Sequence, residues 1–146
     1  MKTCAMCGSS DIIRQENQQD MTRFKVGNKK ITIHLTGLSW SKCKNCGEDY
    51  LNPQDCKIES QKLFEALAEE RKKRGLLTGE EIKAIRESFG FTQVEFEKLL
   101  GIGAKSFVRW ENYRSDQSKS ADLLLRAIKK GGKEFLLSLI EEKRIA

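Results

Sequence analysis

Apolar and polar residues alternate in the first third of the chain, which is typical of β-strands. The clearest alternation runs through residues 31–36, where every second side chain is a large aliphatic one. This two-residue period places one face of a strand against a core. Two shorter β-type segments, 11–16 and 22–26, come earlier, and the turn signal Gly27 and Asn28 follows the second. The pattern therefore predicts a β-hairpin near the N-terminus.

After the single proline, Pro53, the pattern changes to a helical one. Apolar side chains recur every three or four residues through 53–74, and Gly75 follows as a C-terminal cap. Asn52 and Pro53 suit the N-cap and the first position of such a helix. We expect a connecting helix over this segment.

Five further helices are predicted beyond Gly75. Threonine and glutamate three residues apart form capping boxes at Thr78 and Thr92, which start helices at 79–88 and 93–100. Three more helices are expected at 104–112, 120–130 and 133–144, the first after Gly101 and Gly103 and the last after Gly131 and Gly132. The predicted fold class is α+β, divided into a β-containing module (1–52), a connecting helix or linker (53–75) and an all-α five-helix domain (76–146).

Cysteines supply the strongest chemical signal in the β module. Two pairs with CxxC spacing, Cys4 with Cys7 and Cys43 with Cys46, lie on either side of the hairpin, and a glycine follows each pair. Four thiolates make a closed tetrahedral site with no open position for water, which is the pattern of a structural zinc. A module of about 50 residues also has too small a core to fold firmly without such a staple. We predict one structural zinc per chain, in preference to a redox pair, another metal or disulfides.

Two other residues compete for the metal. Cys56 falls on the apolar stripe of the connecting helix, where we expect a buried free thiol, and His34 falls on the polar side of its strand, where we expect a solvated side chain. Neither is needed to complete the zinc site.

Composition narrows the function classes. The chain of 146 residues has a net charge of +6 and a single histidine, so chemistry built on imidazole lacks its usual parts. The apolar runs are too short for a membrane helix, and the N-terminus has no secretory pattern. We expect a cytoplasmic binding protein and no enzyme.

Residues 91–112 resemble the core of the Xre/Cro-type helix-turn-helix family. Within this segment a short capped helix, a glycine turn and a second helix follow one another. We expect five apolar side chains to face inward: Val94, Leu99, Ile102, Phe107 and Trp110. The resemblance implies that Ala104, Lys105, Ser106 and Arg109 reach DNA bases, and that Gln93 braces the DNA backbone.

Charge agrees with a nucleic-acid partner. Between residues 105 and 133 there are eight basic and three acidic side chains, and such a local excess favours phosphate contacts. A second basic run in the linker is expected to touch phosphates only: Arg71, Lys72, Lys73 and Arg74. Four apolar residues of the last predicted helix either form a homodimer contact or close the domain core: Leu136, Leu137, Leu139 and Ile140.

Taken together, the order of CxxCG, hairpin, CxxCG, connecting helix and helix-turn-helix resembles the YgiT/MqsA family of two-domain antitoxins over nearly the whole chain. The resemblance implies a zinc module that binds and neutralises a toxin, typically an mRNA-cleaving ribonuclease. It also implies a C-terminal domain that dimerises on a palindromic operator in double-stranded DNA and represses transcription of its own operon. The alternative is a stand-alone or phage-type zinc-containing regulator without a toxin. A metal-dependent enzyme or an RNA-binding zinc ribbon is a weaker alternative, because four cysteines leave no open metal position.

Three positions differ from the related domains. Lys105 stands where proteins resembling MqsA carry a base-reading asparagine. Tyr113 replaces the glycine that usually follows the recognition helix, and Glu97 replaces a small residue near the turn.

Overall fold

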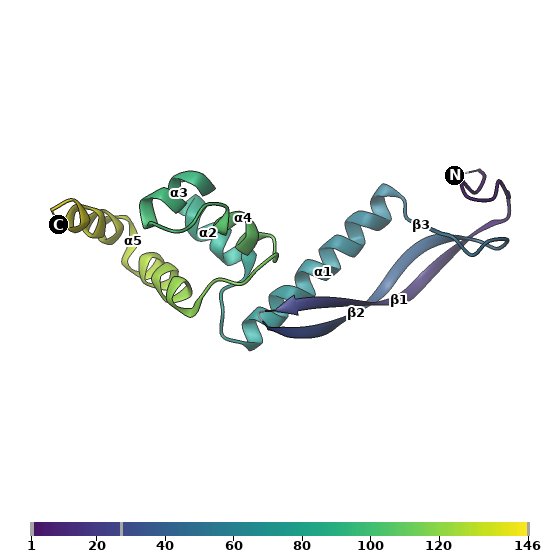
Figure 1. Ribbon diagram of the computed structural model, residues 1–146, viewed down its shortest axis with the longest axis horizontal. Coiled ribbons are helices and arrows are strands. Elements are labelled where there is room, and N and C mark those ends of the chain that lie inside the picture. The colour runs from purple at the N-terminus through teal and green to yellow at the C-terminus, as the bar shows by residue number, and fades with distance from the viewer. Residues whose placement is uncertain (1, 27, 146) are drawn as a thin grey trace. The chain divides into compact units, whose positions relative to one another are not determined.

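The computed structural model describes residues 2–26 and 28–145 and divides the chain into two compact units, Met1–Ala66 and Leu67–Ala146 (Figure 1). Side chains are described for the same residues except 26 and 143–145. None of the described helices has an apolar stretch of the length that a bilayer requires.

The N-terminal unit is built on a long antiparallel hairpin. Strand β1 (Ile12–Val26) pairs with β2 (Lys29–Cys43), and the short β3 (Asp49–Tyr50) adds to the other edge of β2. The first part of helix α1 (Pro53–Lys73) runs along this hairpin (Figure 1). The predicted hairpin is confirmed, but its strands are longer than the predicted segments.

An irregularity in the middle of the hairpin explains why the strands were underestimated. Asn17 has a left-handed φ of 55°, and the pairing register shifts between Gln15 and Asp20. On β2, Gly37 has φ 67°, so the inward alternation of Ile33 and Leu35 passes to Leu38. A bulge of this kind breaks the two-residue period on which strand prediction depends.

Two side chains of this unit test the sequence interpretation directly. His34 is exposed, as expected for the polar side of β2. Cys56 is also exposed, so the prediction of a buried thiol was wrong. Its position on α1 faces solvent because Asp55, its neighbour, is the buried residue of this turn.

The C-terminal unit contains the last turns of α1 and helices α2 (Gly79–Ser88), α3 (Gln93–Leu100), α4 (Ser106–Glu111) and α5 (Lys119–Ile145). Both predicted capping boxes are present, at Thr78 and at Thr92. Helix α5 is interrupted at Gly132, whose φ of 74° and ψ of −168° are non-helical. The two predicted helices on either side of Gly132 are therefore confirmed as the two halves of α5.

Aromatic rings lie at the centre of the core of this unit. Phe96 is fully buried and its ring lies 5.6 Å from that of Phe91 and 5.1 Å from that of Phe107, centroid to centroid. Trp110 follows at 5.3 Å from Phe107. Val94 is 57% exposed, so its predicted inward position was wrong.

Arg71 fastens the end of α1 to the chain that follows α4. Its side chain is 1% exposed. Its guanidinium donates to Asp116 Oδ1 at 3.0 Å, to the Trp110 carbonyl at 2.8 Å and to the Ser115 carbonyl at 2.9 Å. It also lies over the Tyr113 ring, 4.4 Å from the centroid. The sequence prediction that Arg71 touches DNA phosphates is therefore corrected, because this cation is already enclosed by protein acceptors.

We expect Arg71→Met to lower the free energy of unfolding of the C-terminal unit by about 3 kcal/mol. The substitution keeps most of the buried volume but leaves two carbonyls and one oxygen of the Asp116 carboxylate without their donor. Arg74 is the matched control, since it also binds Asp116 but is 36% exposed, and Arg74→Met should cost less than about 1 kcal/mol. Urea unfolding followed by circular dichroism measures both; equal losses would contradict the role of Arg71.

Candidate metal centre and nucleic-acid interface

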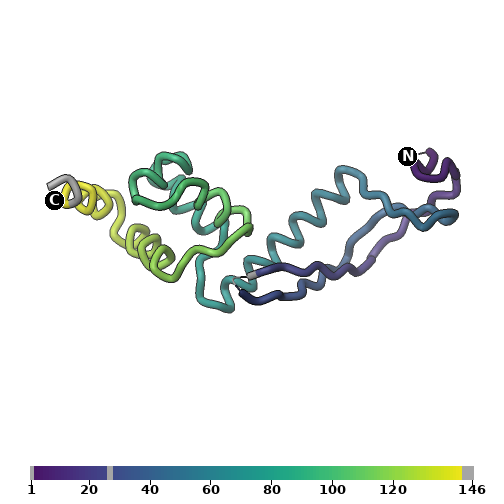
Figure 2. Tube along the Cα trace, viewed as in Figure 1, coloured from purple at the N-terminus to yellow at the C-terminus, as the bar shows by residue number. Residues whose placement is uncertain are grey.

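Two loops of the same shape bring the four paired cysteines together. Cys4 and Cys7 precede β1, and the other pair lies at the turn between β2 and β3, so both loops lie at one end of the hairpin (Figure 2). In each loop the amide of the glycine donates to the carbonyl of the first cysteine at 2.9 Å, Gly8 to Cys4 and Gly47 to Cys43. Both glycines have a left-handed φ, 72° and 79°, which explains why glycine follows each pair.

The sulfur positions fit a tetrahedral metal ion. All four Sγ atoms lie within 4.8 Å of one another, with Cys4 and Cys46 at 3.5 Å and Cys7 and Cys43 at 3.6 Å. Four bonds of about 2.3 Å to zinc require sulfur separations of about 3.8 Å. Among the described residues no other group of three or more potential ligands gathers in this way. The predicted cysteine cluster, which fits one structural zinc, is confirmed.

Tyr50 supports this cluster from β3, and sequence reasoning missed it. Its hydroxyl lies 2.8 Å from Cys4 Sγ and accepts the amide of Ala5 at 3.1 Å. The hydrogen bond from Tyr50 lowers the pKa of the Cys4 thiol to about 6, and the same contact raises the pKa of Tyr50 to about 12. Tyr50 therefore favours the thiolate form of Cys4, which is the form that binds a metal ion. The only sequence signal was its place four residues after Cys46.

The crowding of sulfurs also favours a cation. The backbone of Glu48 acts to lower the pKa of Cys46, but loss of hydration and the neighbouring thiols outweigh it and raise this pKa to about 12. A divalent cation removes the conflict because it lets all four sulfurs ionise. The chemistry such an ion supplies here is structural, since the four cysteines complete its coordination.

We expect Tyr50→Phe to weaken zinc binding by about tenfold or more, because the hydroxyl orients and ionises a ligand. Competition with a chromophoric chelator measures this affinity on the full chain. Tyr113→Phe makes the same chemical change in the C-terminal unit and should leave zinc affinity unchanged. Equal affinity of the Tyr50→Phe and unmodified proteins would exclude this role of the hydroxyl.

In the C-terminal unit, Glu97 anchors the start of α4. Its side chain is 5% exposed, and its two oxygens accept the amides of Lys105 at 3.1 Å and Phe107 at 3.0 Å. A carboxylate at a helix N-terminus satisfies amides that have no partner within the helix. The unusual residue noted in the sequence is therefore a buried cap of α4.

Two of the predicted base-reading residues are exposed cations. Lys105, with φ 63°, and Arg109 face solvent, and their side chains have no hydrogen bond or ion pair within the described part of the chain. Ala104 is exposed beside them. Ser106 is only 7% exposed, so its predicted outward position is corrected. It is the first residue of α4 and lies between the two residues whose amides Glu97 accepts.

Gln93 is tied to a buried ion pair. Glu111 accepts Arg86 Nε at 2.8 Å and Arg86 Nη2 at 3.1 Å, and Gln93 Nε2 donates to the same carboxylate at 2.8 Å. This pair joins α2 to α4 and raises the pKa of Arg86. One hydrogen of the Gln93 amide remains for another acceptor.

Tyr113 takes a left-handed backbone conformation, which favours glycine. Its φ is 58°. The hydroxyl accepts the amide of Gly79 at 3.0 Å and donates to Glu80. Burial and then Glu80 raise the pKa of Tyr113 to about 12. These bonds, together with Arg71 over the ring, hold a strained backbone position that glycine would occupy at lower cost.

In the linker run, Arg71 is buried and Arg74 pairs with Asp116 at 2.5 Å. Lys72 and Lys73 are 56% and 69% exposed and pair with glutamates one turn earlier in α1. These two lysines are the most exposed cations of this run, and Arg74 is 36% exposed.

The β module with its metal-binding cysteines and the helical unit with its exposed cations define a metal-stabilised two-part protein. A protein-family model described as the antitoxin component of the bacterial toxin-antitoxin system, MqsA, matches residues 1–139. The chain belongs to this MqsA antitoxin family. No curated protein matches the sequence significantly.

Proposed function

We propose that this antitoxin is a zinc-stabilised, sequence-specific repressor of its own operon. In this account α3 and α4 form an Xre/Cro-type helix-turn-helix, and α4 enters the major groove of a palindromic operator. The zinc module binds and neutralises a toxin of the ribonuclease class.

The DNA-binding part of the proposal rests on two cations without ion pairs, one at the N-cap of α4 and one within it. Four arginines at other positions of this unit are paired with carboxylates: Arg71, Arg74, Arg86 and Arg126. Arg114, in the loop after α4, is exposed and has no ion pair among the described residues. Lys105 and Arg109 are exposed and have no such partner among the described residues. Free cations on a short helix are suited to phosphates and to guanine edges.

Residues around α4 add backbone contacts to the proposal. Gln93, at the start of α3, has one amide hydrogen left for a phosphate. Lys72 and Lys73 are exposed and lose little when a phosphate replaces their glutamates, because surface ion pairs contribute about 0–1 kcal/mol. Ala104 is small enough for close approach to the DNA.

Arg109→Ala should weaken binding to the cognate operator by about 1–3 kcal/mol and relax selectivity at one base pair of each half-site. Lys72→Gln with Lys73→Gln should instead weaken binding to all sequences alike and reduce the salt dependence by about one unit of slope per lost contact. Fluorescence anisotropy at several salt concentrations, on the promoter fragment of this gene and on random DNA, separates the two. A uniform loss for Arg109→Ala would refute base contact.

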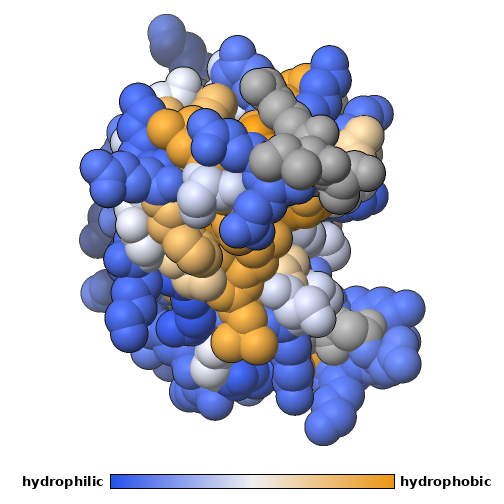
Figure 3. All heavy atoms as spheres, turned by 90° about the vertical axis from the view of Figure 1, so that its left-hand side faces the viewer, coloured by the Kyte–Doolittle hydropathy of each residue, from blue (hydrophilic) through white to orange (hydrophobic). Residues whose placement is uncertain are grey.

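We propose a homodimer formed through the second half of α5, with two corrections. Leu136 is 2% exposed and belongs to the core cluster, so it is removed from the predicted contact. Phe135 and Leu137 remain exposed, at 38% and 48%. Apolar side chains lie among charged ones on the face of the molecule in Figure 3. Leu139 and Ile140 are half-buried. Ile140 packs against the core cluster, so it closes the domain core, and Leu139 stays in the proposed contact.

Leu137→Glu should convert the full chain to a monomer at tens of micromolar, because it places a charge in an apolar contact. Leu123→Glu is the control, since Leu123 is 67% exposed on the first half of α5. Sedimentation velocity measures the oligomeric state of both variants and of the unmodified chain. A dimer that survives Leu137→Glu, or an unmodified chain that is already monomeric, would remove this interface.

The toxin part of the proposal is tested by co-expression with the adjacent gene. A family of antitoxins supports a toxin partner, and we expect a stable complex that suppresses RNA cleavage by the purified gene product. Residues 1–66 should carry the binding, so double substitution of Cys43 and Cys46 by serine should release the toxin while operator binding by the C-terminal unit persists. A gene product that neither cleaves RNA nor binds the chain would favour a stand-alone regulator.

A further inference from the structure

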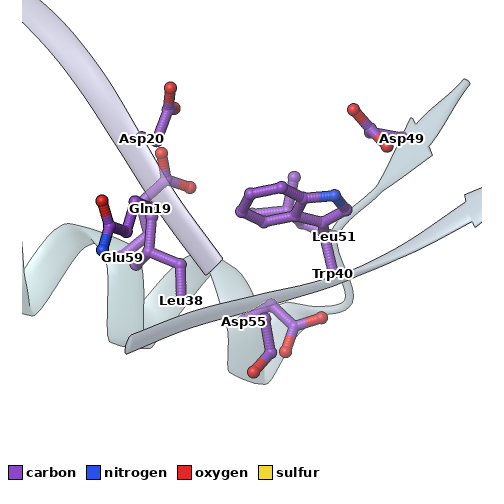
Figure 4. Close-up of a pocket in the computed structure, with 9 residues that line it drawn as sticks. Gln19, Asp20, Leu38, Trp40, Asp49, Leu51, Asp55 and Glu59 are labelled. Carbon is purple, nitrogen blue, oxygen red and sulfur yellow. The ribbon is translucent and has the colours of Figure 1, made fainter. Parts of the chain in front are cut away.

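A cavity of about 280 Å³ opens within the N-terminal unit, between the hairpin, β3 and the start of α1. It has the indole of Trp40 at its centre, with Gln19, Asp20 and Glu59 on one side of the ring and Asp49 on the other (Figure 4). Its volume is at the lower end for drug-sized ligands. It is sufficient for one long side chain.

Two of the four carboxylates that line this cavity are already neutralised. Asp55 receives both terminal nitrogens of Arg14, at 2.6 and 2.7 Å, and this pair lowers the pKa of Asp55. Asp49 lies 3.4 Å from Lys42. The chain thus already uses a guanidinium to satisfy one wall of the cavity.

The other two carboxylates have no cation. Asp20 accepts only the amide of Met21, at 2.8 Å, and the half-buried Glu59 has no hydrogen bond or ion pair among the described residues. They come from different elements, β1 and α1, and face the same space. Asp20 is exposed and Glu59 is half-buried, and two like charges that line one cavity favour an incoming cation.

Trp40 adds an aromatic surface between these charges. The indole is half-buried, and its Nε1 is buried without a hydrogen-bond partner among the described residues. Tryptophan gives the strongest cation–π contacts. A metal ion fits less well, because the only described group of three or more metal ligands is the cysteine cluster and not these carboxylates.

We propose that this cavity receives a lysine or arginine side chain of the toxin, held over Trp40 and between Asp20 and Glu59. The inference rests on the proposed function, in which the partner is a ribonuclease. An enzyme that grips RNA exposes basic side chains toward a polyanion. An antitoxin that offers carboxylates beside an aromatic ring engages those side chains in place of RNA.

The first test needs no toxin. The peptide acetyl-Gly-Arg-Gly-amide is titrated into the zinc-loaded full chain, and the indole N–H signal of Trp40, assigned with Trp40→Phe, is followed by NMR. We expect a saturable shift that the neutral citrulline peptide does not cause. The double substitution Asp20→Asn with Glu59→Gln should weaken binding of the arginine peptide at least about fivefold. Equal shifts with both peptides, or equal affinity of the double variant, would overturn the proposal.

The second test uses the product of the adjacent gene and the same double variant. The affinity of the double variant for that gene product should fall at least about fivefold. The control variant, Glu16→Gln with Glu65→Gln, removes two exposed charges outside the cavity and should keep the affinity of the unmodified chain. Equal loss in both pairs would overturn the cavity as a specific contact, and so would no loss in either. If the unmodified chain does not bind this protein but still binds the arginine peptide, the toxin function fails and the cation site stands.

Discussion

Four sulfur atoms close the base of the hairpin, and the N-terminal unit depends on that closure. Few apolar side chains of this unit are fully buried, chiefly Ile33, Leu35 and Leu38 on β2. A core of this size does not offset the conformational entropy of ordering two 15-residue strands. Metal ligation at the base of the hairpin supplies the missing stabilisation. The free energy of zinc binding at a structural site contributes directly to the free energy of folding. Tyr50 and the two glycines that follow the cysteine pairs shape the loops for this purpose.

In the C-terminal unit, buried charged side chains fix the position of one short helix. Its aromatic core fixes the helices, but the position of α4 depends on polar groups around it. Glu97 holds the amides at its start, Glu111 ties its end to Arg86, and Arg71 takes the carbonyl of Trp110. Each of these groups is buried and satisfied, and this is what makes a six-residue helix rigid enough to present Arg109.

The parts that sequence reasoning predicted well are those with local signals. CxxC spacing, capping boxes and the glycine that interrupts α5, Gly132, each act within a few residues, and each is found in the structure. The missed features depend on distant partners. Nothing near Arg71 in the sequence indicates that Asp116 and two carbonyls enclose it, and nothing near Glu97 shows that it caps a helix beyond the next turn. Ser106 and Leu136 were misplaced for the same reason, since the side of a short helix that faces the core is decided by packing.

Hydrogen exchange on the full chain with and without zinc tests the central claim most directly. Removal of zinc by a chelator should abolish protection of the β1 and β2 amides, whereas amides of α2, α3 and the first half of α5 keep theirs. Re-addition of one equivalent of zinc should restore the protected hairpin. A hairpin that stays protected without metal would contradict the account, because its stability would then come from its own core.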